Sequence, residues 1–135
     1  MGLASYIGCN VEIPLSDEDS DDLIIIGNCF SDEHHLSNIK KYHFTTPYVY
    51  EVSSHWGIEI SKYVNKRIRV ESKEKLIELC KIMDSQLEKG DFFELYSCWV
   101  GEETDNREGK ITMRINNFDI DQIEIPEKTL VRVEK

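Results

Sequence analysis

The stretch that decides the fold is SKEKLIELCKIMDSQLEKG, residues 72–90. Its apolar residues recur every three or four positions, so they line one side of a helix; they are Leu76, Ile77, Leu79, Cys80, Ile82, Met83 and Leu87. Ser72 can cap the free N–H groups at the start, and Gly90 can adopt the left-handed turn that ends a helix. The pattern predicts a helix over about 73–89 whose apolar side packs on a sheet.

Most of the remaining chain carries the shorter patterns of β-strands. Apolar residues form an unbroken run or alternate with polar ones in segments 23–26, 48–52, 56–61, 67–70, 92–100, 111–115 and 129–133. We expect 23–26 to be buried on both faces, and 92–115 to form a hairpin around the polar tip 101–109. An alternative for 58–64 is a short helix. Together these patterns predict an α+β fold, with a largely antiparallel sheet packed by one main helix in a single domain, 1–135.

Charge is distributed unevenly along the chain. The net charge is −10, and residues 1–35 hold eight carboxylates and no Lys or Arg. Residues 36–75 carry a net +4, and residues 76–135 carry a net −6. This overall sign disfavours binding to nucleic acid or to an anionic membrane surface. It favours either a basic protein partner or a purely solubilising role.

The cysteines and the first residues of the sequence indicate the cellular compartment of the protein. Cys9, Cys29, Cys80 and Cys98 form no Cys-x-x-Cys pair, so we expect neither a thioredoxin-like motif nor a zinc ribbon. The start of the chain has no secretory leader pattern, and the aliphatic run 23–26 is too short to span a bilayer. We expect a cytoplasmic protein with free thiols.

The sequence supports no metal site or cofactor. The acidic run starting at Asp17 would need glycine at its sixth position and glutamate at its twelfth to be an EF-hand, but those positions hold Asp22 and Asn28. His34 and His35 are adjacent and diverge in any regular structure, so they are poor ligands for one metal ion. The glycines form no phosphate-binding loop. We therefore predict neither metal nor cofactor.

Nucleophilic catalysis also lacks support. Ser72 and Lys75 match Ser-x-x-Lys, but a helix cap explains Ser72 better. Cys80 lies on the apolar side of the predicted helix, where packing is the expected role. We therefore predict no catalytic residues, and an enzyme is unsupported.

Acidic and aromatic residues are the candidates for contact with a partner. Carboxylates would attract a basic protein, and large aromatic side chains commonly anchor interfaces. The residues predicted to bind the partner are Asp17, Glu18, Asp19, Asp21, Asp22, Tyr48, Tyr50, Trp56, Glu102, Glu103 and Asp105.

Two stretches, SYIGCN (5–10) and TTPYVYEV (45–52), have the character of family motifs. In its size, its acidity and its lack of a catalytic signature, the whole chain resembles the small bacterial immunity proteins that neutralise toxins. This resemblance implies a cytoplasmic inhibitor that occludes the active site of a basic toxin. It assigns no individual residue.

Two other functions stay open. A small-molecule-binding or catalytic α+β domain would have a pocket between sheet and helix, with His43, His55, Trp56, Glu59 and Cys29 as candidates. A homo-oligomer could instead form through an exposed sheet edge.

Overall fold

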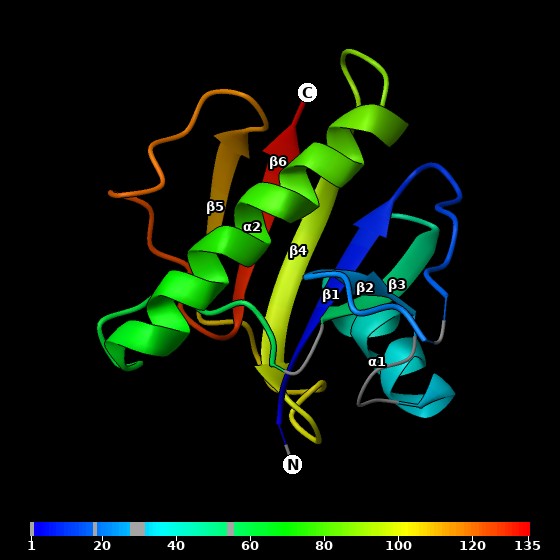
Figure 1. Cartoon of the computed structure of the whole chain (residues 1–135). Coiled ribbons are helices and arrows are strands. Elements are labelled where there is room, and N and C mark those ends of the chain that lie inside the picture. The colour runs from blue at the N-terminus through cyan, green and yellow to red at the C-terminus, as the bar shows by residue number, and fades with distance from the viewer. Residues whose placement is uncertain (1, 18, 28–31, 54–55) are drawn as a thin grey trace.

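The computed structural model describes residues 2–17, 19–27, 32–53 and 56–135. Figure 1 shows its helices and strands along the chain. In order they are β1 (Leu3–Cys9), β2 (Ile25–Ile26), α1 (Glu33–His43), β3 (Tyr48–Ser53), α2 (Lys66–Gln86), β4 (Phe92–Trp99), β5 (Gly109–Arg114) and β6 (Thr129–Glu134). The predicted α+β class is confirmed.

The strands form a six-stranded sheet in the order β2-β3-β1-β4-β6-β5. Neighbouring strands are antiparallel except β5 and β6, which are parallel, so the sheet is largely antiparallel as predicted. β1 lies inside the sheet, with Tyr6 opposite Glu51 of β3 on one side and Tyr96 of β4 on the other.

The two helices cover opposite faces of the sheet. Side chains alternate across β1, so Ile7 contributes to the apolar core beneath α2, while Tyr6 contributes to the smaller core beneath α1. Leu79 of α2 and Ile39 of α1 are each fully buried in their respective core. In Figure 1, α2 crosses the face of the sheet that is turned to the viewer, and α1 lies at the end formed by β1, β2 and β3.

Helix α2 is the predicted main helix, but it begins earlier than expected. Its cap is Asn65, whose side chain accepts a hydrogen bond from the Ile68 N–H at 2.9 Å. Residues 67–70 therefore belong to the helix, and the prediction of a strand there is wrong. Ser72 lies inside the helix, where its hydroxyl accepts a hydrogen bond from the Glu59 N–H at 3.2 Å. Gly90 does have a positive φ, but in the turn that follows the helix.

Three further expectations about strands are wrong. The run 23–26 gives only the short edge strand β2, with Leu23 exposed rather than buried on both faces. Residues 92–115 form no hairpin, because β6 lies between β4 and β5. Segment 56–64 is neither strand nor helix, and its one bridge joins Ile60 to Ile125. β1 and α1 had not been predicted.

The described cysteines pack in the interior. Cys9, Cys80 and Cys98 are buried and free of disulfide bonds. Burial raises the pKa of the Cys80 thiol to about 12, as expected for a packing role. Cys29, His55 and Glu18 lie outside the described residues. Neither described helix has the length and apolar character needed to cross a bilayer.

Candidate protein-binding surface

The acidic run lies in a loop that is closed at its base. The Ser16 N–H donates to the Ile26 carbonyl at 2.9 Å, and the Ile26 N–H donates to the Ser16 hydroxyl at 2.9 Å. Ile24 is buried in the core beneath α2 and anchors the returning arm. We refer to residues 16–26 as the acidic loop. Its two ends are hydrogen-bonded to each other, and Ile26 also pairs with Val52 of β3, so its carboxylates project from a fixed base.

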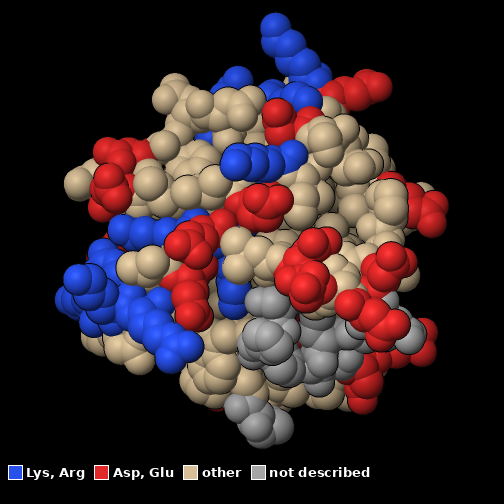
Figure 2. Space-filling model, viewed as in Figure 1, with Lys and Arg blue, Asp and Glu red and all other residues tan. Residues whose placement is uncertain are grey.

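The carboxylates of the acidic loop face solvent, together with leucines at its two ends. Asp17, Asp19, Asp21 and Asp22 are all exposed. Leu15, just before the loop, is 66% exposed, and Leu23 is 39% exposed. In Figure 2, acidic residues gather on the right of the view, where this part of the chain lies, and basic residues gather on the left. Exposed leucines among carboxylates form a mixed apolar and anionic surface.

Two of the predicted aromatic anchors, Tyr48 and Tyr50, lie on β3, and Tyr50 contacts the segment that leads into the acidic loop. The hydroxyl of Tyr50 accepts a hydrogen bond from the Ile13 N–H at 2.9 Å, which joins β3 to the segment leading into the loop. Burial raises the pKa of this hydroxyl. Tyr48, opposite Cys9 in the sheet, is 40% exposed. Of the two, Tyr48 offers more surface to a partner, whereas Tyr50 supports the loop.

The other predicted binding residues belong to a second region. Trp56 packs its ring edge-on against Trp99, with 5.2 Å between centroids. Trp99 pairs with Leu3 at one end of β1, whereas Tyr48 pairs with Cys9 at the other. The structure therefore separates Trp56 from Tyr48 and Tyr50.

Glu102, Glu103 and Asp105 have partners within the protein. The Lys128 ammonium lies 3.1 Å from a Glu102 oxygen and 3.0 Å from an Asp105 oxygen, and these hydrogen bonds raise the pKa of Lys128. Glu103 is buried, and its carboxylate accepts a hydrogen bond from the Gly101 N–H at 2.8 Å. These contacts fold the connection between β4 and β5 and partly neutralise its charge.

His43 and Glu59, two of the residues proposed for a small-molecule pocket, do not converge. His43 is buried on the α1 side, where its ring stacks on Tyr96 at 3.9 Å between centroids. Glu59 is buried on the α2 side, where its carboxylate accepts from the Ser61 hydroxyl at 2.8 Å. Because the sheet separates these two side chains, they cannot line one pocket. Within the described residues, no three His, Cys, Asp or Glu side chains are placed to hold a metal ion.

Comparison of the chain with protein-family models, with curated proteins and with solved structures found no match.

Sequence reasoning missed the leucines of the acidic surface and the neutralising role of Lys128. The sequence does indicate that the two leucines are exposed, because Leu15 and Leu23 flank a strongly polar run in which few positions are buried. No sequence pattern indicates the role of Lys128, because it lies 23 residues from Asp105 along the chain.

Proposed function

We propose that this protein is an inhibitor that binds a basic protein through its acidic loop, in the manner of an immunity protein that occludes the active site of a toxin. The observation that carries the proposal is the acidic loop itself, closed at its base and presenting four described aspartates between Leu15 and Leu23. Surface carboxylates alone also serve solubility. A docking surface also needs apolar side chains beside its charged ones, and Leu15 and Leu23 provide them at the two ends of the run of aspartates.

The two kinds of side chain would contribute differently to binding. Long-range attraction by the aspartates accelerates the encounter with a basic partner and fixes its orientation. The affinity comes mainly from the few apolar side chains that lose contact with water, for which Leu15, Leu23 and Tyr48 are available. A partner that fits therefore combines basic residues with an exposed apolar patch.

The test compares two variants with equal loss of negative charge. The loop variant D17N/D19N/D21N/D22N removes four carboxylates from the acidic loop. The control variant E74Q/E88Q/D121N/E124Q removes four exposed carboxylates elsewhere. A basic protein captured from extracts of the source cells by the natural protein is identified by mass spectrometry, and its association rate is measured at several salt concentrations. We expect the loop variant to associate roughly tenfold or more slowly at low salt, with a weaker salt dependence.

A second comparison separates steering from affinity. Leu15→Ser with Leu23→Ser retains the charge and should mainly accelerate dissociation of the captured complex, because lost contacts act on the dissociation rate. Equal association rates for the loop variant and the natural protein would contradict the proposal. Equal slowing by the loop variant and the control would also contradict it, since net charge alone would then explain the effect.

A further inference from the structure

The outward side of α2 is exposed to solvent and carries apolar residues. Between residues 66 and 81, the exposed residues recur every three or four positions and so form one strip along the helix; they are Lys66, Arg67, Val70, Glu74, Ile77 and Lys81. Val70 is 46% exposed, and Tyr63, in the turn before the helix, is 80% exposed. Solvent-facing positions of a helix usually carry polar side chains. We refer to this set of residues as the α2 strip.

The α2 strip begins in a basic region. Lys62, Lys66 and Arg67 are all exposed. Arg67 lies 3.2 Å from a Glu71 oxygen, whereas Lys62 and Lys66 have no carboxylate partner among the described residues. This surface therefore combines cationic with apolar side chains, and the acidic loop combines anionic with apolar ones. The two surfaces are complementary in charge, and both offer apolar contacts.

The acidic loop and α2 lie on the same face of the sheet. Ile24 and Ile26 of the loop belong to the same apolar core as Leu79 and Met83 of the helix. In Figure 1 this face is turned to the viewer, with the start of α2 at the lower left and the loop to the right of the helix. Figure 2 shows basic residues gathered on the left and acidic residues on the right. The complementary surfaces are thus separated within one copy.

A two-fold axis would bring these surfaces together between two copies. When two copies face each other across an axis that runs vertically in the view, the left side of one lies opposite the right side of the other. Each acidic loop then lies over the basic start of α2 in the other copy, so the same contact forms twice. The two α2 helices supply apolar side chains between these contacts. Two-fold dimers are the commonest assemblies of identical chains.

We infer that a second copy of this chain binds the α2 strip, with its acidic loop against Lys62 and Lys66. The net charge of −10 opposes association at long range. At about 0.15 M salt this repulsion is screened beyond roughly 8 Å, whereas opposite charges in contact still attract. The inference needs no second protein, so it stands independently of the proposed function. A basic partner would compete with the second copy for the acidic loop.

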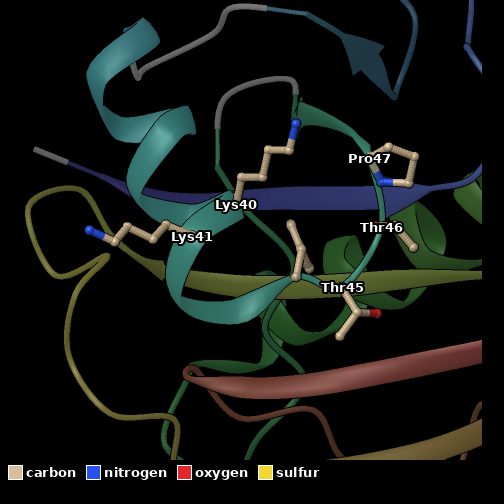
Figure 3. Close-up of a pocket in the computed structure, with 6 residues that line it drawn as sticks. Lys40, Lys41, Thr45, Thr46 and Pro47 are labelled. Atoms are coloured by element: carbon tan, nitrogen blue, oxygen red, sulfur yellow. The ribbon is translucent and has the colours of Figure 1, made fainter.

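Another exposed pair of lysines fits the acidic loop less well. Lys40 and Lys41 line a hollow of about 550 Å³ at the end of α1, and Figure 3 shows their side chains directed apart. The hydroxyls of Thr45 and Thr46 in this hollow already donate to a Glu94 oxygen, at 3.1 and 3.2 Å. Because α1 and α2 cover opposite faces of the sheet, these lysines are outside the proposed contact. They provide a control.

The test is the molecular mass of the full chain in solution, measured by sedimentation equilibrium. We expect the mass to rise toward that of a dimer over roughly 1–500 µM protein, because dimerisation depends on protomer concentration. K62E/K66E and D19K/D21K each oppose like charges in both contacts and should weaken dimerisation roughly tenfold or more. V70S/I77S retains the charges and should also weaken it, through lost apolar contact. Circular dichroism shows whether each variant retains the fold.

Mixtures of the charge-reversed variants give the sharpest result. In a dimer of K62E/K66E with D19K/D21K, both contacts again join opposite charges. This mixture should therefore form dimers although neither variant does so alone. K40E/K41E is the matched control, since it has the same net charge as K62E/K66E but changes exposed lysines on the other face. It should dimerise as the natural protein does, and it should pair poorly with D19K/D21K.

Several results would overturn the inference. One is a natural protein that stays monomeric at every concentration. Another is a dimer that persists in both charge-reversed variants, which would place the contact elsewhere, such as at a sheet edge. A mixture of these two variants that stays monomeric would also contradict it. Because K62E/K66E retains the acidic loop, capture of a basic partner by this variant tests the proposed function separately from dimerisation.

Discussion

At the scale of single residues, His43 joins α1 to the acidic connection between β4 and β5. Its Nε2 donates to the Glu103 carbonyl at 2.8 Å, and Arg107 donates to the His43 carbonyl at 3.3 Å. Its Nδ1 is buried and has no hydrogen-bond partner in the described structure. Burial of the ring, with a smaller contribution from Arg107, lowers the pKa of His43 below its usual 6.5.

This burial predicts a loss of stability in mild acid. The unfolded chain binds a proton on His43 at a higher pH than the folded protein, so the free energy of unfolding decreases as pH falls below 6.5 and levels off below the folded pKa. Urea denaturation between about pH 7.5 and 5.5 measures this decrease. His43→Gln, which retains a donor for Glu103, should flatten the pH dependence, and His34→Gln at an exposed site should not. An unchanged profile for His43→Gln would refute the prediction.

Gly8 is a second position at which the packing determines the residue type. A Cβ atom there would overlap the Thr46 hydroxyl and lie 3.1 Å from the Phe44 ring. Thr46 cannot move freely, because its hydroxyl donates to a Glu94 oxygen at 3.2 Å that also accepts from the Thr45 N–H at 3.0 Å. Glycine is therefore needed where the connection between α1 and β3 lies on β1.

Gly8→Ala should lower the free energy of unfolding by roughly 1–3 kcal/mol, the usual cost of overpacking a core. Gly109→Ala is the control, since its Cβ would lie 3.4 Å from the nearest atom, the Thr129 hydroxyl. Chemical denaturation of both variants measures the difference, and an equal loss in both would show that the close approach at Gly8 is easily relieved.

At the scale of elements, the start of α2 shows where sequence patterns are ambiguous. Arg67, Ile68, Arg69 and Val70 alternate as in a strand, yet a helix also accommodates them with Ile68 half-buried and Val70 exposed. Four residues are too few to separate a period of 2 from one of 3.6. The deciding feature is Asn65, which caps the helix, whereas the predicted cap Ser72 is buried six residues inside it.

Removal of this cap should weaken the protein measurably. Asn65→Ala leaves the Ile68 N–H without its 2.9 Å partner and should lower the free energy of unfolding by about 1 kcal/mol. Asn65→Asp provides another oxygen at the same position and should retain most of the stability. Denaturation midpoints of the two variants compare them directly. If alanine and aspartate gave the same midpoint, the helix would not depend on this cap.

The sequence predicts which segments form strands better than it predicts how those strands pair in the sheet. The strands β3, β4, β5 and β6 follow from alternating or continuous apolar residues, and the packing role of Cys80 follows from its position on the helix. β1 was missed because all seven of its residues are buried, so Ser5 and Gly8 hide the pattern. The prediction of a hairpin between β4 and β5 is wrong for another reason. The order of strands depends on contacts between residues far apart along the chain, such as that of Lys128 with Asp105.

At the scale of the whole molecule, some acidic side chains are exposed to solvent, and others are buried and hydrogen-bonded within the protein. The described aspartates of the acidic loop are exposed. Glu94 and Glu103 are buried and hydrogen-bonded instead. A count of carboxylates cannot distinguish these groups, because the distinction depends on which partners the fold brings near.

The interior position of β1 has a consequence for biosynthesis. Residues 3–9 are synthesised well before one of their two neighbours in the sheet, β4, which extends to Trp99. Closure of so large a loop is entropically costly, and topologies rich in distant pairings assemble slowly. The nascent strand β1 therefore waits, with Leu3 and Ile7 unprotected, until β4 has been translated. Chaperone occupancy during translation should accordingly be greatest on chains that end before residue 99.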